Sequence, residues 1–221
     1  MIAVIFDLDG TLAETAPDLI GALNSVAWNE GWPGLDPVTD RGIAGRGGRA
    51  LLQAAIQGAG LPPDPARVED LLPAFLAAYE ARIAAESHLY PGAEACLNAL
   101  EAEGWRVGVC TNKPERLARL LLEALGVGDR FGALLGADTL PVRKPDPRHF
   151  TETIVRLGGA PGGALLVGDT VTDRETARAA GVPCVLTRFG YAVEAPDTLA
   201  PEAWIDRLDE VPALVPRLLP G

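Results

Sequence analysis

The chain begins Met1-Ile2-Ala3-Val4-Ile5-Phe6-Asp7-Leu8-Asp9-Gly10-Thr11-Leu12, and the predicted fold depends on this stretch. The apolar run from Ile2 to Phe6 is typical of a buried parallel strand, and it ends in two carboxylates, Asp7 and Asp9. In an extended chain, a spacing of two residues puts both side chains on one side. Gly10 permits a sharp turn just past the strand end, where open α/β sheets bind their ligands. We therefore expect the carboxylate pair to lie at a functional edge of a sheet.

Two neighbouring carboxylates can divide the chemical work of a reaction. One can attack an electrophile or hold a hard cation while the other moves protons. A lone Asp-Gly pair would more simply end the strand in an Asx-turn. The remainder of the chain distinguishes between these two interpretations.

The composition is that of a globular protein with an excess of acidic residues. Its 221 residues suit one large domain, or one domain with a smaller insertion, and 48% of them are hydrophobic and 22% charged. The formal net charge of −11 argues against nucleic acid or an anionic membrane as the main partner.

The cysteines and the hydropathy pattern indicate the compartment. Cys96, Cys110 and Cys184 are widely spaced and form no C-x-x-C pair, which fits a reducing compartment. No apolar stretch approaches the roughly 20 residues that a membrane helix needs. Asp7 interrupts the N-terminal apolar run too early for a signal peptide. We expect a cytoplasmic protein.

Residues 14–88 show helical periodicity and are predicted to form a small helical domain. We expect helices at residues 15–31, 50–58 and 65–86. Pro73 should kink or split the last of these helices. Because no strand is predicted from Thr15 to His88, the segment is interpreted as an insertion into an α/β core formed by residues 1–13 and 89–221.

A glycine-rich segment, Gly45-Arg46-Gly47-Gly48-Arg49-Ala50, formally matches the dinucleotide fingerprint G-x-G-x-x-G/A. No apolar strand precedes it, so we interpret it as a glycine-rich helix start. Arg46 and Arg49, beside exposed backbone amides, could bind an anion; a flexible loop with two solvated arginines is the alternative.

Beyond Tyr90-Pro91-Gly92, strand and helix patterns alternate. Strands are expected at residues 105–110, 133–135, 164–167 and 182–186, with helices before and after them. With the first strand, this alternation predicts a Rossmann-like three-layer α/β/α sandwich with a parallel sheet.

Polar side chains follow three of these strands. They are Asp7 and Asp9, then Thr111 and Asn112, then Asp169 and Asp173. Because parallel strands all point the same way, these residues should converge at one edge of the sheet.

Lysine occurs only at Lys113 and Lys144, and all the other basic residues among the 19 Lys and Arg are arginine. We expect Lys144 to be functional, whereas Lys113 is either functional or a solvated loop charge. The carboxylates suit a hard divalent cation bound by oxygens, most simply Mg²⁺. The cation and Lys144 would neutralise a bound phosphoryl group, and Thr111 with nearby backbone amides would hold its oxygens.

Four motifs in this order resemble those of the haloacid dehalogenase superfamily. They are Asp7-x-Asp9-Gly10-Thr11, Thr111-Asn112, Lys144-Pro145, and Gly168-Asp169 with Asp173 four residues on. The resemblance runs from the first strand to the last helix, and the helical insertion is similar to the superfamily's cap. Ala16-Pro17-Asp18-Leu19, Thr111-Asn112-Lys113 and Gly45-x-Gly47 are most similar to the phosphoglycolate phosphatase branch. That branch often has Asp-Ser in place of Glu14-Thr15, and Ser in place of Thr170.

The resemblance implies roles for individual residues. Asp7 would attack phosphorus and form an aspartyl-phosphate, while Asp9 would protonate the leaving oxygen and then deprotonate the attacking water. Thr111 would bind the phosphoryl group, and Lys144 would steady Asp7 and the phosphate. The implied metal residues are Asp7, Asp9 through its main-chain carbonyl, Asp169 and Asp173, the last orienting the site. The residues expected to bind substrate are Gly10, Thr11, Asn112, Lys113 and Arg46.

The favoured function is a Mg²⁺-dependent phosphomonoester hydrolase acting on a small phosphorylated metabolite, with 2-phosphoglycolate the first choice because the cap would close over the site. Arg46 is the candidate for binding a substrate carboxylate. We expect a monomer or a homodimer.

Several alternatives were weighed. Asp9 and the acidic fourth motif argue against dehalogenation, and the lack of any lysine before Lys113 argues against Schiff-base phosphonate cleavage. The intact acidic set disfavours a binding module without turnover. A sugar-phosphate mutase of the β-phosphoglucomutase kind stays open, as does a phosphatase for a sugar phosphate, a nucleotide or pyrophosphate.

Three further features were given structural interpretations. His88 and His149 are isolated and are expected to be surface or helix-end residues. Phe189-Gly190-Tyr191 is expected to form a plain turn, or else to border the site.

Overall fold

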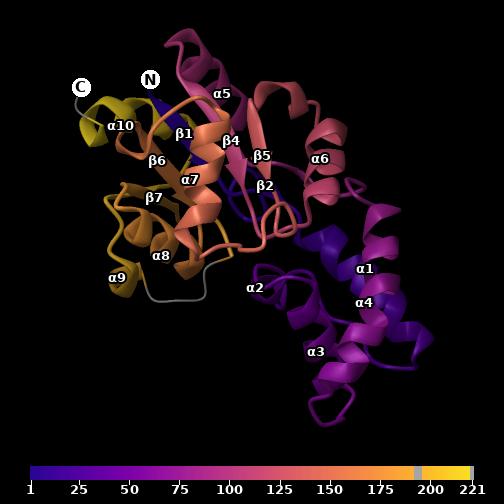
Figure 1. Cartoon of the computed structure of the whole chain (residues 1–221). Coiled ribbons are helices and arrows are strands. Elements are labelled where there is room, and N and C mark those ends of the chain that lie inside the picture. Colours follow the sequence, from indigo (N-terminus) through magenta and orange to yellow (C-terminus); the bar gives the residue numbers. More distant parts are fainter. Residues whose placement is uncertain (192–195, 220–221) are drawn as a thin grey trace. The chain divides into compact units, whose positions relative to one another are not determined.

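The computed structural model describes residues 1–191 and 196–219, and the chain divides into two compact units (Figure 1). One unit comprises Met1–Glu14 with Leu89–Gly221, and the other comprises Thr15–His88. Each unit is described by itself.

A six-stranded parallel sheet forms the centre of the first unit. Its strands are β1 (Ala3–Phe6), β4 (Arg106–Cys110), β5 (Ala133–Leu135), β6 (Ala164–Gly168), β7 (Cys184–Thr187) and β8 (Ala203–Ile205). Their order across the sheet is β5-β4-β1-β6-β7-β8. Phe6 at the end of β1 lies opposite both Val109 of β4 and Val167 of β6. The residues that follow these three strands therefore emerge together at one edge.

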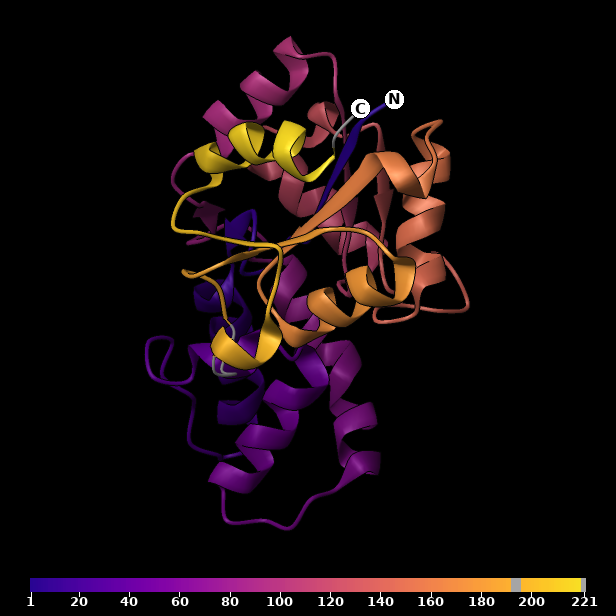
Figure 2. The ribbon, with the colours of Figure 1, turned by 90° about the vertical axis from the view of Figure 1, so that its left-hand side faces the viewer.

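Helices cover both faces of the sheet, as Figure 2 shows. On one face, Phe150 and Ile154 of α7 (Pro147–Arg156) and Ala177 of α8 (Val171–Ala180) pack against the strands. Helices α5 (Ala93–Ala102) and α10 (Val211–Leu218) lie on the other face, and α6 (Glu115–Ala124) connects β4 to β5. Because the central strands are buried on both faces, their sequences are continuously apolar. The predicted three-layer α/β/α sandwich is confirmed, with β8 as an edge strand that the sequence did not indicate.

The second unit is helical. It contains α1 (Ala16–Asn29), α2 (Arg41–Ala44), α3 (Gly48–Gly58) and α4 (Pro65–Glu80). Of the two outcomes predicted for Pro73, a kink or a split, the split is wrong, because α4 runs through it. Pro73 lies on the exposed side of α4, while Phe75 and Tyr79 on the buried side are each 1% exposed. Packing on the buried side therefore maintains the helix despite one lost main-chain hydrogen bond.

The glycine-rich segment is a helix start, as predicted. Gly47 precedes α3 with a φ of 83°, a conformation that glycine adopts without strain. A Cβ atom on Gly48 would lie 2.4 Å from the Phe75 ring, so only glycine allows α3 to begin this close to α4.

Two short strands mark the points where the chain leaves and re-enters the α/β unit. They are β2 (Ala13–Glu14) and β3 (His88–Leu89), which form a separate two-stranded sheet. The sequence did not predict either strand. The remaining elements are α9 (Pro196–Leu199) and the 3₁₀ turns Gly128–Arg130, Pro161–Gly163 and Leu208–Glu210.

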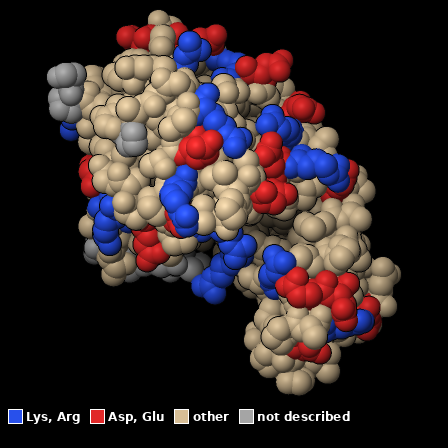
Figure 3. All heavy atoms as spheres, in the orientation of Figure 1, with Lys and Arg blue, Asp and Glu red and all other residues tan. Residues whose placement is uncertain are grey.

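Charged side chains of both signs alternate on the face of the α/β unit that Figure 3 shows. Arg119 pairs with Glu115 on α6, and Arg156 pairs with Glu152 on α7. Within residues 1–191 and 196–219, none of the helices combines the length and the apolar character needed to span a membrane.

Candidate active site

Asp7 lies at the carboxyl end of β1, at the centre of the sheet. Its main-chain N–H donates to the carbonyl of Val167 at 2.8 Å, which continues the pairing of β1 with β6 by one residue. The residue is only 9% exposed, and its Oδ1 accepts the N–H of Leu8 at 2.7 Å. The buried strand predicted from the sequence thus carries this carboxylate into the interior of the sheet edge.

A tight turn follows Asp7. The carbonyl of Leu8 accepts the N–H groups of Thr11, Leu12 and Ala13, and Gly10 has a φ of 80°. A Cβ atom on Gly10 would lie 2.4 Å from Asp169 Oδ2, so glycine is required there for both conformation and space. The turn places the Thr11 hydroxyl 2.9 Å from Asp169 Oδ1, to which it donates.

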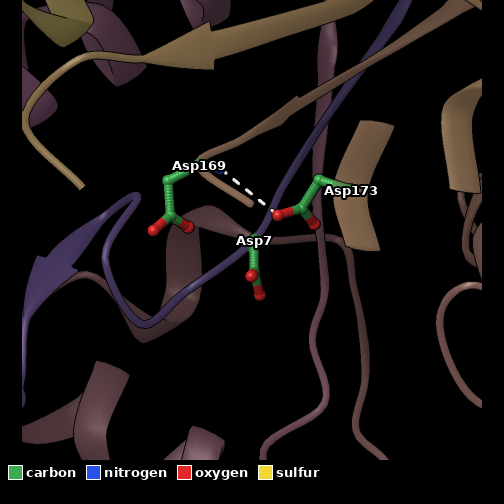
Figure 4. Close-up of side chains that lie close together, drawn as sticks. All are labelled: Asp7, Asp169 and Asp173. Atoms are coloured by element: carbon green, nitrogen blue, oxygen red, sulfur yellow. Dashed lines mark hydrogen bonds between the residues drawn. The ribbon is translucent and has the colours of Figure 1, made fainter. Parts of the chain in front are cut away.

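Asp169 and Asp173 come from the end of β6 and the first turn of α8 (Figure 4). Both carboxylates are fully buried. Asp173 Oδ2 accepts the N–H groups of Asp169 and Thr170 at 3.2 and 3.1 Å, and the Thr170 hydroxyl at 2.8 Å. This arrangement is a capping box, so the same residue starts the helix and faces the site.

The three carboxylates converge. Asp7, Asp169 and Asp173 each offer an oxygen within 4.8 Å of the other two, and Figure 4 shows the three side chains close together. A set made only of carboxylate oxygens fits a hard divalent cation rather than a thiol- or imidazole-binding metal.

Lys144 is the counter-charge of this cluster. Its side chain is buried, and Nζ lies 2.7 Å from Asp173 Oδ1 and 3.0 Å from Asp7 Oδ1. The Asn112 amide donates to the main-chain carbonyl of Lys144 at 3.0 Å. Asn112, expected to bind substrate, therefore anchors the segment that carries the lysine.

Thr111 and Lys113 follow β4. Thr111 is buried, and its Oγ1 accepts the N–H of Lys113 at 3.2 Å. Lys113 is 6% exposed, and its Nζ donates to Asp9 Oδ1 at 2.9 Å and Oδ2 at 3.1 Å. The structure thus decides against a solvated loop charge at Lys113, because the side chain is a buried partner of Asp9.

The pKa values of the ionisable groups in the site differ strongly from their usual values. Burial, opposed by Lys144 and reinforced by the negative charge of Asp173, raises the pKa of Asp7 to about 6. Burial and the charges of Asp173 and Asp7 raise the pKa of Asp169 well above its usual range. For Lys144, burial alone would lower the pKa, but the neighbouring carboxylates of Asp173 and Asp7 raise it. Negative charge in the cluster therefore exceeds what one lysine compensates, as expected where a cation binds.

The remaining sequence-predicted residues lie as follows. The Gly10 N–H donates to Ala13 and the Thr11 N–H to Leu8, so both amides serve the turn, and their binding of substrate stays a prediction. Arg46 belongs to the helical unit, where it lies exposed just before α3. Arg49 forms an ion pair with Glu69 at 2.6 Å.

Sequence reasoning gave no role to the pair of Glu14 and Tyr191. The Tyr191 N–H donates to Asp169 Oδ2 at 2.7 Å, and its hydroxyl donates to Glu14 Oε1 at 2.5 Å. The segment Phe189-Gly190-Tyr191 therefore borders the site, and the plain-turn interpretation is insufficient. The only signal in the sequence was its place just after a strand of the sheet.

His149 lies in the first turn of α7, as the helix-end alternative predicts, but it is not on the surface. It is fully buried on α7, and its Nε2 lies 2.9 Å from the Gly136 carbonyl while Nδ1 lies 3.4 Å from Cys110 Sγ. Burial lowers the pKa of His149, so the neutral ring joins the end of β4 to α7. His88 is exposed, as expected.

The chain is similar to known proteins over nearly its whole length. Residues 1–181 match the family model of the haloacid dehalogenase-like hydrolases. The chain is 43% identical over 209 residues to a phosphoglycolate phosphatase of Caulobacter vibrioides, which covers 95% of this chain and 88% of that protein. It is 40% identical over 219 residues to a phosphoglycolate phosphatase of Cereibacter sphaeroides, covering 99% of this chain and 100% of that protein.

A similar solved structure is that of a predicted phosphoglycolate phosphatase from Haemophilus somnus. The two structures agree with a TM-score of 0.87 at 28% sequence identity, over 96% of each chain.

Proposed function

Because the chain belongs to the haloacid dehalogenase-like hydrolase family, we propose that it is a Mg²⁺-dependent phosphomonoester hydrolase whose substrate is 2-phosphoglycolate. One observation carries the proposal. Asp7, Asp169 and Asp173 offer oxygens within 4.8 Å of one another, beside the buried ammonium of Lys144. Transfer of a phosphoryl group requires a nucleophile and positive charge in the same site. The carboxylates can provide the nucleophile and hold a cation, and Lys144 provides further positive charge.

Asp7 is the proposed nucleophile. One of its oxygens attacks the substrate phosphorus, the bond from phosphorus to the ester oxygen breaks, and an aspartyl-phosphate forms. Lys144, 3.0 Å from Asp7 Oδ1, orients the carboxylate and offsets the negative charge that would repel the phosphate. A water oxygen then attacks the same phosphorus, and Asp7 departs as a carboxylate.

Asp9 is the proposed proton carrier. It gives a proton to the ester oxygen as that oxygen leaves, so glycolate departs as an alcohol, and it then takes a proton from the attacking water. Lys113 contacts both oxygens of Asp9, at 2.9 and 3.1 Å, and therefore fixes the direction of the carboxyl group. A residue that exchanges protons with water must be accessible to it. Asp9 is partly exposed, whereas Asp7 is only 9% exposed.

Thr111 is proposed to bind the phosphoryl group. Its oxygen accepts the N–H of Lys113, so its own O–H can donate to a phosphoryl oxygen. Lys144 supplies a charged donor from the segment between β5 and α7. Asn112 acts indirectly, through its hydrogen bond to the carbonyl of Lys144.

Asp7, Asp169 and the main-chain carbonyl of Asp9 are the proposed ligands of Mg²⁺. When bound, the cation would neutralise charge on the phosphoryl oxygens during transfer. Asp173 is better suited to orientation than to ligation, because Lys144, Thr170 and the Asp169 N–H already use its two oxygens. The raised pKa of Asp169 supports this assignment.

The substrate assignment rests on the relatives. Two of them, 43% and 40% identical over nearly the whole chain, are phosphoglycolate phosphatases. Phosphoglycolate carries a carboxylate besides its phosphate, and Arg46 is the proposed contact for it. All three cysteines are free thiols, which supports the proposed cytoplasmic location.

The test is phosphate release from a panel of small phosphorylated compounds, with Mg²⁺ and with a chelator. The panel contains 2-phosphoglycolate, a hexose phosphate, a nucleotide, pyrophosphate and p-nitrophenyl phosphate. We expect Mg²⁺-dependent release with a clear preference for 2-phosphoglycolate. Glu152→Gln, at a partly exposed carboxylate of α7, serves as a variant that should behave like the wild type.

Three results would contradict the proposal in different parts. Equal turnover of all substrates would remove the substrate assignment but keep the chemistry. Isomerised hexose phosphate without phosphate release, in the presence of a bisphosphate activator, would identify a mutase. No turnover of any ester would overturn the hydrolase.

A further inference from the structure

One carboxylate near the site accepts hydrogen bonds from two tyrosines. Glu14 Oε1 accepts the hydroxyl of Tyr191 at 2.5 Å, and Oε2 accepts the hydroxyl of Tyr90 at 3.1 Å. Both rings are buried, with 3% of Tyr191 and 7% of Tyr90 exposed. Glu14 ends β2, Tyr90 follows β3, and Tyr191 follows β7, so three separate segments meet at this carboxylate.

Tyr191 extends this arrangement to Asp169. Its N–H donates to Asp169 Oδ2 at 2.7 Å, while the Thr11 hydroxyl donates to Oδ1 at 2.9 Å. A Cβ atom on Gly10 would lie 2.8 Å from the Tyr191 ring, and one on Gly190 would lie 2.2 Å from Asp169 Cβ. The Tyr191 segment is therefore packed directly against the proposed metal ligand, with no room for either to shift toward the other.

The main chain at Tyr191 belongs to no helix or strand, because β7 ends at Thr187. Its position depends on side-chain anchors, and the hydrogen bond from its hydroxyl to Glu14 joins it to the two-stranded sheet. A charge-assisted bond of this kind, formed by a buried hydroxyl, is stronger than a neutral one. A carboxylate ligand whose orienting donor moves loses part of its affinity for the metal.

We infer that Glu14 is a positioning residue for the metal site: through the hydroxyl of Tyr191 it fixes the main-chain N–H that orients Asp169 for Mg²⁺. The inference rests on the proposed function, because Asp169 is there a ligand of Mg²⁺. Glu14 does not touch the reacting atoms in this role. It acts from the last residue of the α/β unit before the helical segment begins at Thr15.

Tyr90 provides a matched control within the same cluster. Its hydroxyl binds the other oxygen of Glu14, but its own N–H donates to the carbonyl of Leu12 at 2.9 Å and not to Asp169. Its ring packs against Phe189, with centroids 4.5 Å apart. Tyr90→Phe and Tyr191→Phe therefore remove one hydroxyl each from one carboxylate, and only the second removal lies on the connection to Asp169.

The experiment measures Mg²⁺ binding to metal-free protein by calorimetry, for the wild type, Tyr191→Phe, Glu14→Gln and Tyr90→Phe. We expect Tyr191→Phe and Glu14→Gln to weaken Mg²⁺ binding about tenfold, which is at the lower end of the effect of removing a partner that orients a metal ligand. The affinity of Tyr90→Phe for Mg²⁺ should stay within about twofold of the wild-type value. The concentration of Mg²⁺ that half-activates phosphate release should rise in parallel. Turnover at saturating Mg²⁺ should return close to the wild-type value, which a generally misfolded variant would not show.

The outcomes separate this inference from the proposed function. If the wild type binds no Mg²⁺, the proposed metal site and this inference both fail. If the wild type binds Mg²⁺ and Tyr191→Phe binds it equally well, the inference alone is overturned. Equal weakening by Tyr90→Phe and Tyr191→Phe would also overturn it, because the effect would then not follow the connection to Asp169. Should Glu14→Gln not fold, Tyr191→Phe decides the matter.

Discussion

Each of the two units buries a carboxylate completely, and the two carboxylates are treated very differently. In the helical unit, Asp18 on α1 accepts the Arg82 Nε–H at 3.1 Å, the Glu86 N–H at 2.9 Å, and both the N–H and the hydroxyl of Ser87 at 2.7 Å. Within the described part of the α/β unit, the donors to the Asp169 carboxylate are the Thr11 hydroxyl and the Tyr191 N–H, and Asp169 lies beside two further carboxylates.

The pKa values shift in opposite directions as a result. Burial raises the pKa of Asp18, but the hydrogen bonds from Glu86, Ser87 and Arg82 outweigh it, and the pKa falls below its usual range. Burial raises the pKa of Asp169, and neighbouring charges raise it further. Burial alone therefore does not mark a functional carboxylate. A buried carboxylate with a full set of donors stabilises the fold, whereas one that shares too few donors with other carboxylates is suited to bind a cation.

The largest expected difference between the two regions is in turnover. Asp7→Asn should reduce phosphate release at least about a thousandfold, because an amide cannot replace the nucleophile. Asp18→Asn should leave turnover per folded molecule of the same order as in the wild type. Both variants are compared at saturating Mg²⁺, with the folded fraction measured by circular dichroism. Comparable losses in the two would refute the contrast.

Stability should show the reverse order. Asp18→Ala removes the acceptor of four hydrogen bonds and leaves Arg82 and the 86–87 main chain without it, so unfolding should become easier by about 3 kcal/mol. Asp36→Ala is the control, since Asp36 also accepts main-chain N–H groups but lies exposed, and it should lose less. Urea unfolding measures both. Equal losses would show that burial adds nothing at Asp18.

The pH dependence of stability tests the charge excess at the site. The pKa of Asp7 is about 6 in the metal-free fold against 3.8 for an ordinary Asp, so the folded state binds more protons between these values. The stability of the fold that depends on Asp7 is fully present below about pH 4, where the carboxyl group is protonated in both states. It is lost as the pH rises through 6, because the folded state then holds a buried carboxylate. Without metal, Asp7→Asn should therefore be more stable than the wild type at pH 7.5, by roughly 3 kcal/mol.

That advantage of Asp7→Asn should disappear at pH 4. The measurement is the melting temperature of both proteins in a chelator across this range. Parallel curves would contradict the raised pKa, and Mg²⁺ at pH 7.5 should stabilise the wild type more than the variant.

The smallest expected effect is on KM, and it tests whether the helical unit contributes a residue that binds the substrate. Arg46→Ala should raise KM for 2-phosphoglycolate up to about fivefold, as for loss of an exposed ion pair, while KM for p-nitrophenyl phosphate stays constant. Arg49→Ala is the matched control, because Glu69 already pairs with Arg49. An equal change with both substrates would exclude Arg46 as the contact for the carboxylate.

The parts of the fold that the sequence predicted are those with a strong local pattern. The apolar run at β1 and the carboxylates after it placed Asp7 correctly, since a strand buried on both faces leaves a continuous signal. The strand β8 was missed because only one of its three residues is buried, whereas β5, equally short, is buried throughout and was predicted. The strands β2 and β3 have two residues each, too few to show a period.

The contacts that the sequence could not predict join distant positions. The ion pair between Lys113 and Asp9 spans 104 positions, and the bond between Tyr191 and Glu14 spans 177. No periodicity or spacing carries such information, because it depends on how close the strand ends come in space. The burial of His149 was not predicted for the same reason, since its partners Cys110 and Gly136 lie outside α7.

The most direct test of the account is to find the phosphoryl group on the protein. Wild type and Asp7→Asn are mixed with radiolabelled 2-phosphoglycolate and Mg²⁺, quenched with acid within the first turnovers, and digested. The account predicts label on the peptide that contains Asp7 in the wild type, released by hydroxylamine as an acyl phosphate, and none in Asp7→Asn. Free phosphate produced without any labelled peptide, or label on another residue, would contradict it.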